Sequence, residues 1–266
     1  MLTSPSREGS SPISASSFRI KSCIVLFYLS AAVCLPHAQS ADTLYGDRTN
    51  LASARRAADI WTAALSSAPK DFEAAWKLAR ADYWLGGHAP DGERREFLER
   101  GIEAARTATA LEPGRPEGHF WMAANMGSLA ESFGVRAGLK YRRPIKDALE
   151  TVLKIDPAFQ QGSADRALGR WYFKVPGLFG GSTKAAEEHL RASLKYNPKS
   201  TASHFFLAEV LLDAGRKPEA RTELHAVLDA PLDPEWTPED REFKQKAAAL
   251  LVTVEPAAAL PAQPTR

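Results

Sequence analysis

Four prolines divide the chain into repeating units. Pro69, Pro113, Pro157 and Pro198 each follow an apolar helical run, and they are spaced by 44, 44 and 41 residues. A period of this size is typical of stacked helical units, because one helix pair cannot bury its apolar face alone and must pack against the next pair. The spacing therefore predicts an all-α chain of helix pairs arranged as a solenoid.

Small or apolar residues recur at fixed distances before each proline, as close packing of one helix against another requires. The last unit repeats this pattern in both of its helices without any insertion. The positions 12, 8 and 5 residues before the prolines, of which only Ser193 is polar, are Ala57, Trp61 and Ala64, then Gly101, Ala105 and Ala108, then Ile145, Leu149 and Val152, then Ala186, Leu190 and Ser193; the last unit has His204, Leu207, Ala208 and Leu211, then Ala220, Leu224 and Val227.

This register resembles the tetratricopeptide repeat, a helix pair of 34 residues. The resemblance covers about residues 52–234 and implies a solenoid of about five helix pairs with a concave binding surface. A polar capping helix is expected to follow, with Thr237 as its N-cap, Pro238 at its first position and its end near Val254. We therefore expect a repeat domain over residues 41–254 and a disordered tail over residues 255–266, which has little to bury.

The units of 41 to 44 residues are longer than the consensus, and we expect the surplus to form insertions between the two helices of a pair. The insertions are placed near residues 86–95, 127–143 and 173–183. The third contains GLFGGSTK (177–184), which is not a phosphate-binding loop because Lys184 follows the hydroxyls and no strand precedes it. Gly180 and Gly181 are expected to turn the chain, with Ser182 or Thr183 capping the next helix. The free amides at this helix start remain a possible site for a carboxylate.

Three segments carry a more specific resemblance: HFWMAANMGSLAESFG (119–134), ALGRWYF (167–173) and VPGLFGG (175–181). They resemble the T component of tripartite ATP-independent periplasmic (TRAP) transporters, although Val175 stands where leucine is usual and related helical proteins share the loop style. The resemblance implies a periplasmic protein that binds the substrate-binding P subunit and holds a hydrophobic ligand in a cavity. The matching positions are Trp121, Asn125, Gly127, Gly169, Arg170, Trp171, Tyr172, Pro176, Gly177, Gly180 and Gly181.

Aromatic residues beside the expected insertions are candidates to line a cavity or a partner groove, with core packing as an equal alternative. These residues are Trp84, Phe133, Tyr172 and Phe179. The polar Asn125 and Arg170 flank them, and these two either bond neighbouring helices or orient a ligand.

The sequence contains no motif for catalysis. His119 and His204 occupy the fourth repeat position and are expected to be core histidines, and there is no HExxH or GxSxG sequence. We therefore expect no enzyme activity, no metal and no cofactor.

Residues 1–40 have the features of a signal peptide. Arg19 and Lys21 precede an apolar run that ends near Leu35, and cleavage is predicted between Ser40 and Ala41. The run is short for a spanning helix, so an uncleaved anchor is the weaker alternative. Both cysteines lie in this segment, and bulky Val33 argues against lipidation of Cys34. The mature chain is expected to be secreted or periplasmic, without a thiol or a membrane span.

Residues 41–266 carry equal numbers of basic and acidic side chains, which gives no reason to expect a nucleic acid partner. Our first hypothesis is a non-catalytic periplasmic protein of the TRAP T-component type. Its expected partners are a solute-binding protein and a small apolar or carboxylate ligand. The alternative is a generic envelope scaffold that grips a peptide or helix. A homo-oligomer remains open in either case.

Overall fold

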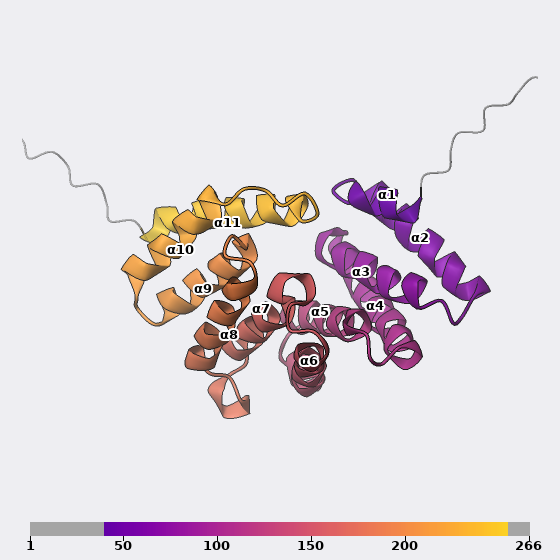
Figure 1. Cartoon of the computed structure of the whole chain (residues 1–266), viewed down its shortest axis with the longest axis horizontal. Helices are drawn as coiled ribbons and strands as arrows, with labels where there is room; N and C mark the ends of the chain where they lie inside the picture. The colour runs from indigo at the N-terminus through magenta and orange to yellow at the C-terminus, as the bar shows by residue number, and fades with distance from the viewer. Residues whose placement is uncertain (1–39, 255–266) are drawn as a thin grey trace, which may run out of the picture. The chain divides into compact units, whose positions relative to one another are not determined.

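The computed structural model describes residues 40–254, so the predicted signal peptide and the predicted disordered tail lie outside the described residues. This part of the chain is all-helical and contains no strand, as predicted (Figure 1). Its elements are α1 (Ala41–Gly46), α2 (Leu51–Ser67), α3 (Phe72–His88), α4 (Asp91–Leu111), α5 (Pro116–Ser132), α6 (Val135–Ile155), α7 (Phe159–Lys174), the short 3-10 helix η1 (Gly177–Phe179), α8 (Thr183–Tyr196), α9 (Thr201–Asp213), α10 (Lys217–Asp229) and α11 (Thr237–Val254).

The helices form two layers. Successive helices pack as pairs, and the first helices of the pairs, α3, α5, α7 and α9, also contact one another. The second helices, α2, α4, α6, α8 and α10, contact mainly their neighbours in the chain. Helix α11 follows the last pair and packs on both α9 and α10. The predicted solenoid of five helix pairs with a capping helix is confirmed.

The predicted packing register is also confirmed by burial. The small and apolar positions before each proline are buried, and only Ala64 and His204 among the predicted set are partly exposed. Small residues are required where helices approach closely. A Cβ on Gly169 would lie 2.5 Å from Leu190 of the paired helix, for example. The recurring small residues therefore mark the contact line between the two layers.

The prediction of insertions between the two helices of a pair is wrong for two of the three expected places. Helices α3 and α4 contain 17 and 21 residues and are joined by Ala89 and Pro90 alone. Helices α5 and α6 have the same two lengths and are joined by Phe133 and Gly134. The surplus residues extend the helices because their apolar positions, such as Leu98, continue the helical period into the core. Of the three expected insertions, only the third, between α7 and α8, contains a loop.

The glycine-rich loop between α7 and α8 is a structural turn, as predicted. Gly180 has a φ of 103°, a backbone conformation that favours glycine. A Cβ on Gly181 would lie 1.6 Å from the carbonyl oxygen of Val175, so only glycine fits there. Ser182 caps α8, because its hydroxyl accepts a hydrogen bond from the amide of Ala185 at 3.2 Å.

Helix α11 connects the two ends of the repeat array. Arg48, which follows α1, donates hydrogen bonds from Nε and Nη2 to the two carboxylate oxygens of Glu239, at 3.0 and 2.5 Å. Further along the same helix, the Glu242 carboxylate lies 2.7 Å from His88 Nε2 of α3. In Figure 1 one end of α11 faces α1. The cap therefore contacts the first repeat as well as the last.

The start of α11 differs in detail from the expectation. Thr237 is already helical, and its hydroxyl donates to the carbonyl of Asp233 at 2.7 Å instead of accepting from the first-turn amides. Asp240 holds this turn, because it accepts hydrogen bonds from the Asp233 amide at 2.7 Å and from Thr201 on α9 at 2.5 Å. In residues 40–254, none of the helices combines the length and apolar character needed to cross a bilayer.

Candidate functional site

Arg170 on α7 bridges three inner helices. It donates two hydrogen bonds to Glu131 of α5, at 3.0 and 2.8 Å, and one to Glu209 of α9, at 2.7 Å. Its guanidinium carbon lies 4.6 Å from the centre of the Phe206 ring. A forked donor between two carboxylates is a rigid arrangement. We refer to the surface that these residues share with Tyr83 and Arg166 as the inner face.

Arg166 lies one helical turn before Arg170 and is uncompensated. Within residues 40–254 its guanidinium has no hydrogen bond and no carboxylate within ion-pair distance. Burial lowers the pKa of Arg166 to about 10, against the opposing effect of Tyr83 and Asp240. A guanidinium that is partly buried without an ion-pair partner would gain stability from any anion that approached it.

Tyr83 on α3 is the accessible aromatic group of the inner face. It is 39% exposed, although its ring packs against that of Trp121 at 5.7 Å. Burial of its hydroxyl raises the pKa of Tyr83, so the phenol stays neutral and can donate a hydrogen bond. Tyr83 on α3 and Arg166 on α7 therefore offer an apolar ring, a hydroxyl and a cation.

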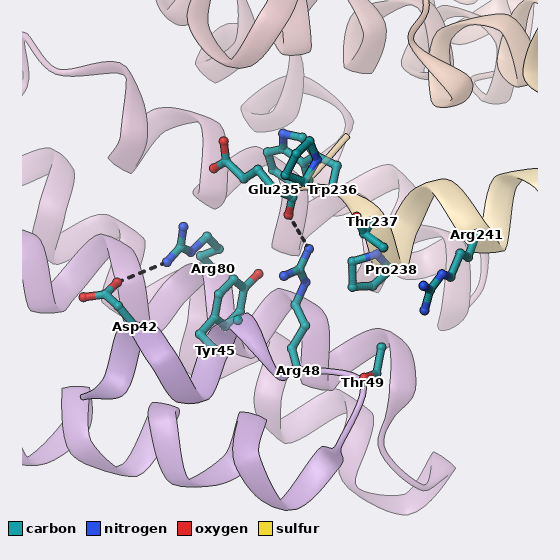
Figure 2. Close-up of a pocket in the computed structure, with 12 residues that line it drawn as sticks. Asp42, Tyr45, Arg48, Thr49, Arg80, Glu235, Trp236, Thr237, Pro238 and Arg241 are labelled. Carbon is teal, nitrogen blue, oxygen red and sulfur yellow. Dashed lines mark hydrogen bonds and ion pairs between the residues drawn. The ribbon is translucent and has the colours of Figure 1, made fainter. Parts of the chain in front are cut away.

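A cavity of about 410 Å³ lies at the seam between α1, α3 and the start of α11 (Figure 2). Arg80 is held there over the rings of Tyr45 and Trp76, at 4.2 and 4.9 Å, and its Nε is buried without a hydrogen-bond partner. Burial raises the pKa of Tyr45 to about 12, against the opposing effect of Arg80 and Arg48. The lining residues are Asp42, Tyr45, Gly46, Arg48, Thr49, Arg80, Pro234, Glu235, Trp236, Thr237, Pro238 and Arg241.

Four of the residues singled out from the sequence are buried in the core. Trp84 and Trp171 donate their indole N–H groups to the carbonyls of Arg48 and Arg142, at 2.7 and 2.8 Å. Asn125 donates to the carbonyls of Ala79 and Trp121, at 2.9 and 2.8 Å, and Trp121 is itself 2% exposed. Asn125 thus ties α5 to α3, the first of the two roles that the sequence left open.

The accessible members of the predicted set are divided among four places. Arg170 is on the inner face. Phe133 lies under the guanidinium of Arg95 at 4.2 Å, and Tyr172 stacks on His189 at 5.3 Å. The loop residues Pro176, Phe179, Gly180 and Gly181 are exposed or partly exposed between α7 and α8. In the part of the chain that the structure describes, these residues are not gathered in one cavity.

Sequence reasoning missed Tyr83, Arg166 and the acids that hold Arg170. The spacing of Arg166 and Arg170 was the available signal, because residues four apart share one face of a helix. The partners Glu131 and Glu209 lie 39 residues before and after Arg170, so no local pattern connects them.

The two histidines at the fourth repeat position have a shared structural role. His119 Nε2 lies 2.9 Å from the carbonyl oxygen of Pro113, and His204 Nε2 lies 3.0 Å from that of Pro198. Each histidine therefore fastens the start of a unit to the proline turn six residues before it. Among the described residues, no group of three or more His, Cys, Asp or Glu side chains converges as a metal site would require.

Stacked helix pairs with an inner layer that lines one face define a helical repeat protein of the tetratricopeptide type. The family model described as RMD1-3, Regulator of microtubule dynamics protein 1-3, matches residues 38–255, and the chain belongs to this family. A comparison with curated proteins finds no significant match.

One solved structure supports the assigned fold. The chain is similar to TTC0263, a thermophilic tetratricopeptide protein of Thermus thermophilus, with 21% identity, a TM-score of 0.60, and coverage of 80% of this chain and 100% of that one. It is also similar to MamA, with 14% identity, a TM-score of 0.46, and coverage of 77% and 96%. None of these comparisons supports the expected TRAP T-component family, and the matching family is RMD1-3.

Proposed function

We propose that the protein is a non-catalytic interaction scaffold whose inner face binds an acidic segment of a partner protein. The observation that carries this proposal is Arg166, a partly buried cation that makes no hydrogen bond and no ion pair within the described residues 40–254. A carboxylate of the partner supplies the missing charge, Tyr83 supplies a hydroxyl and a ring, and the Arg170 cluster holds the surface rigid. Extended inner surfaces of stacked repeats commonly bind peptides or helices.

The same geometry favours binding over acid–base chemistry. The carboxylates of Glu131 and Glu209 are both engaged by Arg170. A carboxylate held in this way by a guanidinium is already occupied by its partner's hydrogen-bond donors.

Site-specific photo-crosslinking tests the proposal directly. We would place a benzophenone amino acid at Tyr83 and, as a control, at Val252, which is 78% exposed on α11. We expect a partner segment containing Asp, Glu or a free C-terminus to be captured from Tyr83 only. Failure to capture such a segment from Tyr83 would contradict the proposal.

The captured segment then provides a quantitative test with two matched variants. We expect Arg166→Met to weaken its binding at least tenfold, and Arg56→Met, an exposed arginine on α2, to leave it unchanged. The Arg166→Met protein should be at least as stable as wild type, by up to about 2 kcal/mol, because an uncompensated cation is removed. Loss of binding without loss of stability separates recognition from folding.

Three narrower hypotheses belong to the same scaffold. Export to the periplasm is tested by cell fractionation and by sequencing of the mature N-terminus, which is expected to be Ala41. A solute-binding P subunit as partner is tested by co-purification with the mature chain. A small hydrophobic or acidic ligand is tested by native mass spectrometry of the purified protein. Of these, the acidic ligand is the one that the chemistry of Arg166 supports.

The matched family, regulator of microtubule dynamics protein 1-3, gives a second candidate function, the regulation of microtubule dynamics. The observation in its favour is the match itself, which extends over residues 38–255 and so includes the whole repeat array. Co-sedimentation of the purified chain with microtubules tests this candidate. A chain that stays in the supernatant at micromolar microtubule concentration would remove it.

A further inference from the structure

The first half of α6 carries an unbalanced positive charge. Between Glu131 and Asp147 there are five basic residues and no acidic one. Lys146 is paired with Glu150, but among the described residues no carboxylate lies within ion-pair distance of the other four. The equal totals of acidic and basic residues therefore conceal a local excess of cations. The four unpaired residues are Arg136, Lys140, Arg142 and Arg143.

Large apolar side chains are exposed beside these cations. Val135 and Leu139, four residues apart on α6, are 80% and 44% exposed. Phe179 of η1 is 41% exposed, and the guanidinium carbon of Arg142 lies 5.1 Å from its ring centre. The contact between Arg142 and Phe179 joins η1 to α6. Exposed apolar groups beside cations are a feature of interaction sites.

A groove of about 450 Å³ lies next to this stretch, at the junction of α4, α5 and α6. Its apolar part is formed by Leu129, Phe133, Ala137 and Tyr141, and its cationic part by Arg95, Arg136 and Lys140. Its one acidic residue, Glu99, lies 3.5 Å from Arg95 and is neutralised by it. The groove therefore combines an apolar floor with a net positive edge.

We propose that this groove and the adjoining first half of α6 bind an acidic amphipathic segment of a partner protein. One bulky apolar side chain of the segment enters the groove beside Ala137, and its carboxylates pair with Arg136, Lys140 and Arg142. The charge complementarity selects an acidic partner, and the recessed apolar floor selects a protein side chain over a flat lipid surface. This site is formed by α4, α5 and α6, and it is independent of Tyr83 and Arg166 on the inner face.

Fluorescence anisotropy with a defined probe tests this proposal. The probe is a labelled synthetic helical peptide of about 15 residues with glutamate on one face and leucine and phenylalanine on the other. Its control peptide has lysine in place of every glutamate. We expect the full chain to bind the glutamate peptide, with an affinity that falls as salt rises, and not to bind the lysine peptide.

Two pairs of substitutions locate the binding. We expect the double substitution of Arg136→Glu and Lys140→Glu to weaken binding of the glutamate peptide at least tenfold. The matched pair Lys195→Glu and Lys199→Glu, on exposed residues of the α8 end, should change its affinity less than twofold. Ala137→Phe should also weaken binding of the glutamate peptide, because the larger side chain fills the groove. The helical circular dichroism spectrum should remain unaltered.

Three results would overturn the proposal: no binding of the glutamate peptide at 50 mM salt, equal binding of the lysine peptide, or no effect of the Arg136 and Lys140 pair. Vesicles of phosphatidylcholine and phosphatidylglycerol form a further arm. Binding to these vesicles without binding to the glutamate peptide would also overturn it, in favour of a bilayer as the occupant.

Discussion

Arg48 and Glu239 form a forked ion pair across 191 positions of the sequence. The Arg48 side chain is 5% exposed, and it also donates to the carbonyl of Glu235 at 2.9 Å. Its guanidinium carbon lies 5.0 Å from the Tyr45 ring centre and 5.3 Å from that of Trp84. The first repeat is thereby fastened to the last helix through a charged group that is almost entirely desolvated.

Replacement of Arg48 should be costly. We expect Arg48→Met to lower the free energy of unfolding by about 3 kcal/mol, because it leaves the Glu239 carboxylate partly buried without its partner. Urea denaturation followed by circular dichroism measures this. The matched control is Arg106→Met, which breaks an exposed pair with Glu103 and should change stability by less than about 1 kcal/mol. Equal effects of the two substitutions would show that the fork contributes no more than a surface pair.

The contact between His88 and Glu242 should make stability depend on pH. Burial lowers the pKa of His88, but hydrogen bonds to Glu242 and to the Trp84 carbonyl outweigh burial, so its pKa is raised. Nδ1 donates a hydrogen bond to the Trp84 carbonyl oxygen at 2.7 Å. Nε2 must therefore carry a second proton in order to donate to the Glu242 carboxylate. The protonated ring is therefore the one that links α3 to α11.

A raised histidine pKa gives stability that is fully present below the unfolded pKa of about 6.5 and is lost as pH rises through the folded value. We expect the stability difference between wild type and His88→Asn to shrink by about 1 kcal/mol from pH 6 to pH 8. The control His225→Asn, at an exposed position, should show no such trend. A difference between wild type and His88→Asn that is constant over this range would contradict the assignment.

Asp82 should produce a second pH dependence at lower pH. Its side chain is fully buried, and burial raises the pKa of Asp82 to about 6, although Arg100 donates two hydrogen bonds to it at 2.8 and 2.6 Å. Because the folded pKa exceeds the unfolded value, the ionised carboxylate costs stability as pH rises through about 6.

Asp82→Asn removes this titration. We expect the free energy of unfolding of wild type, relative to Asp82→Asn, to fall by about 2 kcal/mol between pH 4 and pH 7. Denaturant titrations at four or five pH values measure the trend, and Asp213→Asn at an exposed position is the control. A relative stability that rises over this range would mean that Arg100 outweighs the burial of Asp82.

Gly181 is predicted to be irreplaceable for a steric reason. We expect Gly181→Ala to lower the free energy of unfolding by about 2 kcal/mol, because its Cβ would meet the backbone carbonyl of Val175. Gly177→Ala in the same loop is the control, since a Cβ there meets nothing within 4 Å. Thermal unfolding compares the two, and an unchanged transition for Gly181→Ala would mean that the loop adjusts freely.

The fold was predictable because its determinants are local and periodic. A small or apolar residue such as Ala105 or Leu190 at a fixed distance from a proline reports a helix–helix contact wherever it occurs in the chain. The prediction of insertions was wrong because spacing alone cannot distinguish an added loop from added helical turns. Leu98 in α4 and Tyr141 in α6 are buried, which shows that the added residues form helical turns. Their burial depends on contacts with neighbouring helices.

The candidate sites were less predictable because their partners are distant in sequence. Arg170 was identified from its motif, but the acids that fix it are on α5 and α9. Arg166 is notable because it has no ion-pair partner within the described residues. No sequence pattern indicates that a partner is missing. Trp84, Trp121 and Trp171 were reasonable aromatic candidates, and their burial follows from indole hydrogen bonds and ring packing that composition does not reveal.

The contact of α11 with the first repeat has a consequence for how the array unfolds. An open row of repeats loses its end units first, since a terminal unit has a neighbour on one side only. Here the Arg48 fork and His88 give the first unit a second neighbour, so fraying at either end must break contacts at both. Hydrogen exchange should therefore be nearly as slow in α2 as in α5, and a chain shortened by its last helix should lose protection at its first.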